Sequence, residues 1–292
     1  MRRIILKIIG NNTWSGRLLA SLNLIRRLFL CPYVKLSFIP FRSIISILNT
    51  TPGRFESVRL TDTGVIMLFY STYVVKIPLG PIPLKDLIRN MNQYNLIKAS
   101  EYKAHVSYWL EDHCTHFKME ILLEGNNKRA LASQYFKTIS KAACASIKSQ
   151  KDIYELILLG RQKFIDVTEV QLSIDKDKKY PMSIMHGDLT PRNIMTNTSG
   201  APLLIDLNRF TFKGFEFIDS IHFEVEFESK KIRKNYFHYI ILNFDLLLKI
   251  YGSEVLKIYV LYRIGSEHNN GVKNEGWYYD GMRSLAQKLD SK

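Results

Sequence analysis

The sequence predicts an α+β protein in two parts, a small antiparallel β part followed by a larger, mainly helical part. Short runs rich in β-branched and aromatic residues lie between residues 55 and 77, and tight turns separate them. Helical spacing dominates from residue 130 onward. The 292 residues, 46% of them apolar and 23% charged, allow a large core in one or two domains. We expect a basic N-terminal extension (1–54), a small lobe (55–120) and a large lobe (121–292).

The N-terminal extension is strongly basic. Residues 1–55 hold nine Lys or Arg and no acidic residue, out of a net charge of +14 for the whole chain. Spacing predicts an amphipathic helix over Ser15–Leu30, which Pro32 ends. Its basic and apolar faces fit peripheral attachment to an anionic membrane surface. The alternative, which we favour, is that the apolar stripe packs on the rest of the protein.

Targeting and cysteine signals indicate the cytoplasm. Gly10 interrupts the first apolar run and no cleavage pattern follows, so a secretory signal is disfavoured. No run of about eighteen apolar residues exists, so we expect no transmembrane helix. The three cysteines have no paired spacing, which indicates a reducing compartment. The cluster His113-Cys-Thr-His116 has too few ligands for a zinc site and is interpreted as a surface loop.

The elements follow in order along the chain. Three strands are expected at 55–61, 65–70 and 73–77, with a turn at Thr61–Gly64. A helix over 81–100 comes next, with an apolar stripe at Leu84, Leu87, Ile88, Met91 and Tyr94, and a strand over 117–125 follows it. Helical spacing then covers 130–148, 152–164 and the aromatic-rich stretch 231–263.

Two linked motifs carry the chemistry. The first is Ser183-Ile-Met-His-Gly-Asp-Leu-Thr-Pro-Arg-Asn-Ile-Met195, and the second is the apolar run that ends at Asp206. A hairpin, with strands at 194–196 and 203–205, is expected to return Asp206 to the side of Asn193. Amide and carboxylate oxygens suit Mg²⁺, which keeps water and phosphate as its other ligands. Asp188 is then left to orient or deprotonate a hydroxyl.

At these residues the sequence resembles the kinase-like phosphotransferases. The stretch His186-Gly-Asp-Leu-Thr-Pro-Arg-Asn193 is most similar to the aminoglycoside phosphotransferase and choline kinase branch, because Gly187 stands where protein kinases usually carry Arg. The resemblance implies a two-lobed protein-kinase-like fold. It also implies that Asp188 is catalytic, that His186 braces the loop and that Asn193 and Asp206 bind Mg²⁺. The later Asp219 is implied to brace the lobe.

The resemblance extends to the nucleotide site. Lys76, in Val74-Val-Lys-Ile77, resembles the strand lysine that pairs with ATP phosphates, although such a Lys can also be an edge residue in water. Glu120 and Leu122 would border the adenine, with main-chain contacts. The family's helix Glu is missing, since no Glu occurs between Lys76 and Glu101. Asn92 or Gln93 would take its place, or Glu101 would substitute.

The resemblance therefore predicts ATP-dependent transfer of the γ-phosphate to a hydroxyl of a small molecule or a sugar or glycan. Polycationic aminoglycosides are disfavoured by the net charge, although Glu224, Glu226 and Glu228 could form a local acidic patch. The alternatives are a protein kinase and a catalytically weak pseudokinase that acts as a binding module. A nucleic-acid partner is disfavoured because the basic segment lacks a recognition motif.

Overall fold

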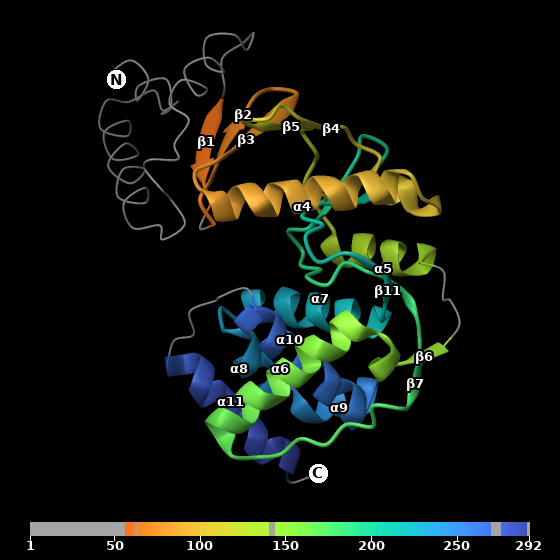
Figure 1. The fold of residues 1–292 in the computed structure, drawn as a ribbon, viewed down its shortest axis with the longest axis vertical. Coiled ribbons are helices and arrows are strands. Elements are labelled where there is room, and N and C mark those ends of the chain that lie inside the picture. The colour runs from red at the N-terminus through yellow and green to blue at the C-terminus, as the bar shows by residue number, and fades with distance from the viewer. Residues whose placement is uncertain (1–55, 62, 140–143, 270–275, 291–292) are drawn as a thin grey trace. The chain divides into compact units, whose positions relative to one another are not determined.

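The computed structural model describes residues 56–61, 63–139, 144–269 and 276–290 (Figure 1). The chain divides into two compact units: one runs to Gly125 and includes Met195–Asn208, and the other comprises Asn126–Ile194 and the residues from Arg209 onward. One unit carries an antiparallel sheet and the other is mainly helical, which confirms the predicted α+β class. The extension 1–54, with its expected helix, lies outside the described residues, so membrane attachment through it stays a prediction.

The sheet of the first unit has the strand order β1-β2-β3-β5-β4. Its bounds are β1 (Ser57–Leu60), β2 (Val65–Phe69), β3 (Tyr73–Pro78), β5 (Phe117–Glu120) and β4 (Leu110–Asp112). The three strands expected before residue 78 are therefore confirmed, and all neighbours are antiparallel. Register places Met67 opposite Lys76 on β3, and Lys76 opposite Phe117 on β5. Alternate residues such as Leu68, Val75 and Ile77 fill the core beneath the sheet.

The rest of the first unit consists of two helices and a hairpin. Helix α4 (Pro81–Lys98) and the 3₁₀ helix η2 (Glu101–Val106) lie between β3 and β4. The hairpin strands β9 (Ile194–Thr196) and β10 (Pro202–Leu204) are confirmed almost residue for residue. Backbone bonds between Leu123 and Thr196, of 3.1 and 2.9 Å, join the hairpin to the segment after β5. This is why 195–208 belongs with the sheet, although the large lobe was expected to contain it.

The second unit is built around packed helices. Its elements are α5 (Lys128–Thr138), β6 (Cys144–Ser146), η3 (Ile147–Ser149), α6 (Lys151–Thr168), β7 (Lys179–Pro181), β8 (Ser183–Met185), β11 (Thr211–Gly214), α7 (Glu216–Lys231), α8 (Tyr236–Leu242), α9 (Phe244–Tyr251), α10 (Ser253–Asn269) and α11 (Gly276–Asp290). Helices α6 and α10 approach closely at two glycines. A Cβ on Gly160 would lie 1.8 Å from the Leu261 carbonyl oxygen, and one on Gly265 would lie 1.8 Å from that of Leu156.

The prediction of a helix over 130–148 is wrong for the second half of that range. Helix α5 ends at Thr138, and Ile139 already has extended backbone angles. Both residues are β-branched, which lowers helix propensity. Cys144–Ser146 instead forms β6, which pairs with β7. Within the described residues, no helix combines the length and hydropathy that a membrane crossing requires.

Candidate active site

The loop from His186 to Asn193 begins directly after β8 and ends directly before β9. Asp219, in the first turn of α7, holds its start. Its two carboxylate oxygens accept the backbone N–H groups of His186 at 2.6 Å and Gly187 at 2.9 Å. Burial raises the pKa of Asp219 to about 6, against the opposing effects of the nearby His186 ring and these two bonds. Asp219 thus contacts the loop backbone, in the place that its bracing role requires.

Gly187 is required by the geometry of this loop. Its φ of +79° lies in the left-handed region, which side chains disfavour. An added Cβ would also meet the backbone oxygen of Arg209 at 2.7 Å. The Tyr262 hydroxyl donates to the Gly187 carbonyl oxygen at 3.2 Å. The requirement for glycine between His186 and Asp188 is therefore steric, since even an alanine would displace the segment at Arg209.

His186 is the first residue of the loop. Its side chain is fully buried, and its ring Nδ1 accepts the backbone N–H of Asp188 at 3.3 Å. That contact orients the peptide that precedes the Asp188 side chain. The described contact of the buried ring is thus with the loop backbone, as the brace implied by the resemblance would require.

The carboxylate of Asp188 is held through one of its two oxygens. Oδ1 accepts from Arg263 Nη1 at 2.8 Å and faces His222 Nε2 at 3.2 Å, while Arg209 Nη1 lies 3.7 Å away. Burial would raise the pKa of Asp188, but the His222 hydrogen bond and the charges of Arg263 and Arg209 hold it well below its usual value. The group is therefore an ionised carboxylate at neutral pH.

Sequence reasoning missed the residues that hold this carboxylate. His222 lies on α7 and Arg263 on α10, 34 and 75 residues away from Asp188. A charged residue inside the apolar run Tyr259-Val-Leu-Tyr-Arg-Ile264 was the available signal, because such a charge must find a partner when the helix is buried. The partner itself could not be chosen without the fold.

Asn193 closes the loop. Its backbone N–H donates to Thr190, and its side-chain Nδ2 donates to the Asp188 carbonyl oxygen, both at 2.9 Å. Since this bond uses the amide nitrogen, the amide oxygen is the atom that can coordinate a cation. The structure thus brings Asp188, His186 and Asn193 together in the second unit.

Asp206 follows the hairpin in the first unit. The Asn197 carboxamide oxygen accepts N–H bonds from Ser199 and Ala201, both at 3.0 Å, which forms the expected turn before the returning strand. Asp206 itself is exposed and has a φ of +62°, a backbone conformation that is uncommon for residues other than glycine. Asn208 donates to its Oδ1 at 2.9 Å, so its other oxygen remains for a ligand.

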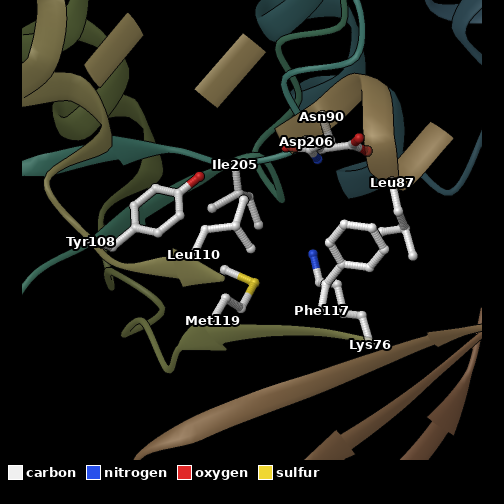
Figure 2. Close-up of a pocket in the computed structure, with 9 residues that line it drawn as sticks. All are labelled: Lys76, Leu87, Asn90, Tyr108, Leu110, Phe117, Met119, Ile205 and Asp206. Atoms are coloured by element: carbon white, nitrogen blue, oxygen red, sulfur yellow. The ribbon is translucent and has the colours of Figure 1, made fainter. Parts of the chain in front are cut away.

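Lys76 and Asp206 line one pocket of the first unit, shown in Figure 2. The figure shows the Lys76 ammonium pointing from β3 toward the side where Asp206 and Asn90 lie. Burial lowers the pKa of Lys76, and the Asp206 carboxylate partly opposes this. The remaining lining is apolar or aromatic: Leu87, Tyr108, Leu110, Phe117, Met119 and Ile205. A cation and a carboxylate thus share a pocket with few other charges.

The amide that accompanies Lys76 is Asn90, rather than Asn92 or Gln93. Asn90 is 8% exposed and lines the pocket, whereas Asn92 is exposed and the half-buried Gln93 is not among the lining residues. The buried face of α4 is set by Pro83, Asn90, Tyr94 and Ile97, so the helix is rotated relative to the expected apolar stripe. Glu101 does not substitute, because it is exposed and lies in η2, after the end of α4.

Glu120 and Leu122 lie at the end of the sheet. Glu120 is the last residue of β5, and its N–H donates to the Trp109 carbonyl oxygen at 3.0 Å. On either side of Leu122, Ile121 donates to Thr72 and Leu123 donates to Thr196, both at 3.1 Å. Among the described residues, no backbone partner is found for Leu122 itself. Its main-chain groups remain available to a ligand.

The acidic patch on α7 is largely neutralised. Glu224 and Glu228 both pair with Arg129, at 2.6 and 2.7 Å. Glu226 pairs with Lys230 at 2.8 Å. A polycationic acceptor would have to displace these partners, so Glu224, Glu226 and Glu228 provide no ready site for one.

Comparisons with known proteins give structural likeness only. No protein-family model and no curated protein sequence matches the chain. Among solved structures, it resembles the choline kinase LicA from Streptococcus pneumoniae, at 15% identity over 86% of this chain and 99% of that chain, with a TM-score of 0.45. It also resembles the aminoglycoside phosphotransferase APH(2'')-IIa in a streptomycin–ATP complex, at 14% identity over 86% and 96%, with a TM-score of 0.44.

A third similar structure is the Plasmodium vivax ethanolamine kinase, at 11% identity over 99% of this chain and 94% of that chain, with a TM-score of 0.43. These structures come from the branch that the catalytic-loop motif indicated. Their low identity and their TM-scores below 0.5 do not carry their ligands or activities over to this chain. The function has to be argued from the chain's own residues.

Proposed function

We propose that this protein is an ATP-dependent phosphotransferase that moves the γ-phosphate to a hydroxyl of a small molecule, sugar or glycan. The observation that supports this best is the rigid His186–Asn193 loop, which presents an ionised Asp188 beside the Asn193 carboxamide. Joint action of this loop with Lys76 and Asp206 on one nucleotide is part of the proposal.

The proposed reaction is a direct displacement. The acceptor oxygen forms a bond to the γ-phosphorus, and the bond from that phosphorus to the β,γ-bridging oxygen breaks. The electron pair of the broken bond leaves on ADP, and the acceptor's proton passes to Asp188 and then to solvent. Because its pKa is held low, Asp188 is a weak base, so its main effect is to align the hydroxyl. This suits a loose transition state, in which the proton moves late.

The Asn193 carboxamide oxygen and the Asp206 carboxylate would hold Mg²⁺. Both offer hard oxygen donors, and each has its geometry set by another hydrogen bond, from Asn193 to the Asp188 carbonyl and from Asn208 to Asp206. The metal would neutralise phosphate charge. Water and phosphate oxygens would complete the coordination of the ion.

Lys76 would bind the phosphates and Leu122 the adenine. A phosphate beside Lys76 would raise its pKa, because an adjacent negative charge favours the ammonium over the neutral amine that burial favours. The free main-chain groups of Leu122, next to the half-buried Glu120, provide a donor and an acceptor for a base edge.

A small acceptor is favoured over a protein substrate by the chain after Asp206. Only residues 207–215 separate Asp206 from α7, and four of these form β11. This leaves no length for the activation segment on which protein kinases rely. The paired acids of α7 disfavour a polycation, so we infer a neutral or polyhydroxylated acceptor such as a sugar.

The test is a screen of labelled-phosphate transfer from ATP to sugars, glycolipids, choline-like alcohols, aminoglycosides and generic proteins. Asp188→Asn should abolish transfer while leaving the affinity for MgATP nearly unchanged. Asp206→Asn should weaken Mg²⁺-dependent nucleotide binding. The matched control is Asp177→Asn, which removes an exposed carboxylate 4.0 Å from Lys148. It should change neither the transfer rate nor nucleotide binding. Normal turnover by the Asp188 variant would refute the assignment.

A second candidate, a nucleotide-independent binding module, is favoured by one observation. Asn90 offers Lys76 an amide rather than a carboxylate, so it adds no charge to that of Asp206 in favouring the ammonium. Under this alternative, MgATP would produce no thermal shift and no hydrolysis would be detected. A thermal shift that Lys76→Met abolishes would instead support the phosphotransferase.

A further inference from the structure

The two oxygens of the Asp188 carboxylate have different surroundings. All of its side-chain contacts with described residues, from Arg263, His222 and Arg209, are made to Oδ1. No hydrogen bond from a described residue to Oδ2 is found, and 31% of the side chain is exposed. The asymmetry leaves one oxygen for the protein and one for a ligand.

A second layer of buried side chains supports the two main contacts, and together these residues form what we call the Asp188 clamp: His222, Tyr259, Arg263, Glu267 and Tyr236. The Tyr259 hydroxyl lies 3.1 Å from His222 Nδ1. Arg263 Nε lies 2.8 Å from Glu267, whose other oxygen accepts from the Tyr236 hydroxyl at 2.8 Å. His222, Tyr259 and Glu267 are at most 6% exposed.

Proton positions in the clamp follow from hydrogen-bond logic. An ionised carboxylate only accepts, so the His222 Nε2 that faces Asp188 must carry a hydrogen. Burial and the nearby Arg263 charge lower the pKa of His222, so the ring is neutral and its Nδ1 is an acceptor. The Tyr259 hydroxyl must therefore donate to Nδ1. The two hydrogen bonds therefore run in one direction: Tyr259 donates to His222, and His222 donates to Asp188.

Arg263 adds a second contact to Asp188, and its guanidinium reaches two carboxylates at once, which the single ammonium of a lysine could not do with the same geometry. It bridges the Asp188 and Glu267 carboxylates through two different nitrogens, each at 2.8 Å. With the imidazole on one side and the guanidinium on the other, rotation of the Asp188 carboxylate about its Cβ–Cγ bond would break at least one hydrogen bond. The clamp therefore restricts the torsion that decides which oxygen points outward.

We propose that His222 and Arg263 are positioning residues that fix the Asp188 carboxylate so that Oδ2 alone meets the acceptor hydroxyl. This rests on the proposed phosphotransferase function. Neither residue contacts the reacting atoms; each acts through Asp188. Because misplacement of a reacting group by about 1 Å can cost about 10²-fold in rate, loosening the clamp should lower kcat strongly.

The experiment compares His222→Leu and His222→Gln, each alone and combined with Asp188→Asn. The probe is hydrolysis of MgATP by the full chain, with water as the acceptor. His222→Leu should lower kcat by about 10- to 100-fold with little change in the KM for ATP, because nucleotide contacts are untouched. His222→Gln should recover part of the loss, since its amide nitrogen can donate to Oδ1. The residual ATP hydrolysis of Asp188→Asn, which already lacks the aligning carboxylate, should not fall further when either His222 substitution is added.

Tyr259→Phe provides a milder variant that preserves the ring. It removes the donor to His222 Nδ1 and should lower kcat several-fold. Tyr180→Phe is its matched control, because Tyr180 is a buried tyrosine of the same unit whose hydroxyl has no hydrogen-bond partner among the described residues. Equal kcat for Tyr259→Phe and the control, or equal losses for His222→Leu with and without Asp188→Asn, would overturn the proposal.

A readout independent of turnover separates this proposal from the function on which it rests. Nitrogen-15 NMR of labelled histidine should show His222 as a neutral ring with hydrogen on Nε2, and its shifts should change in Asp188→Asn and in Tyr259→Phe. A ring with hydrogen on Nδ1, or a doubly protonated ring at pH 7, would overturn the clamp. Absence of ATP turnover in the unsubstituted chain would overturn the function alone, while the NMR result still decides the geometry.

Discussion

Replacing Gly187 by alanine isolates the steric requirement of the His186–Asn193 loop. The left-handed backbone costs a side-chain-bearing residue about 1–2 kcal/mol. The new Cβ would also lie 2.7 Å from the Arg209 carbonyl oxygen and 2.9 Å from its Cβ, so backbone must move. Overpacking of this kind costs a further 1–3 kcal/mol or so, which gives a total of about 2–5 kcal/mol of lost unfolding free energy.

Gly200→Ala is the matched control. Gly200 has nearly the same φ, +81°, but an added Cβ would meet nothing within 4 Å. Its cost should therefore be the backbone strain alone, about 1–2 kcal/mol, reduced slightly by the lower entropy of the unfolded chain. The difference between the two variants, about 1–3 kcal/mol, measures the clash at Arg209.

Urea denaturation of both variants, followed by circular dichroism, measures these costs. Phosphate-transfer or ATP-hydrolysis rates under conditions where each variant is folded provide the functional comparison. Displacement of Arg209, which approaches Asp188, should make Gly187→Ala slower by about 10²-fold, while Gly200→Ala keeps the rate of the unsubstituted chain. Equal destabilisation of the two variants would show that backbone conformation alone selects the glycine.

Three further predictions follow from the described contacts. Asn90→Glu should raise the pKa of Lys76 and lower the KM for ATP, because a carboxylate would hold the ammonium by charge; an unchanged KM and an unchanged Lys76 titration by NMR would contradict this. The pKa of Asp219 is raised to about 6, so the folded state binds more protons than the unfolded state between about pH 4 and pH 6. The free energy of unfolding should therefore fall as pH rises through that range. Asp219→Asn should remove this pH dependence in denaturation curves. Gly160→Ala should separate α6 from α10 and cost about 3 kcal/mol or more in unfolding free energy, since its Cβ would lie 1.8 Å from the Leu261 carbonyl oxygen; a loss below about 1 kcal/mol in urea titrations would show that the helices can shift apart cheaply.

Local signals predicted the hairpin and the strands correctly. The turn between β9 and β10 depends on Asn197 and Gly200, whose contacts lie within four residues. The three strands before Pro78 are likewise joined by tight turns, so alternation and turn residues were sufficient. Errors arose where a pattern was weak, as in α4, where the expected stripe missed the buried Asn90.

Longer-range pairings could not be read from the chain. The Arg263 partner of Asp188 lies 75 residues away, and nothing in the local spacing of either residue selects the other. The same applies to the neutralisation of Glu224 by Arg129, which are 95 residues apart. In both cases packing of helices decides which charges meet, because a buried charge accepts whichever complementary group the fold brings near.

The sequence by itself determined the loop chemistry: which residues offer a carboxylate, an amide oxygen and a cation, and which short strands carry them. These properties depend on neighbours a few residues away, where turn geometry and hydrophobic alternation act directly. Only the tertiary structure decided that the described partners of the Asp188 carboxylate all bind one of its oxygens, and that Asn90 accompanies Lys76. Those outcomes depend on the rotation and packing of helices, and the energies that set them are summed over contacts distant in the chain.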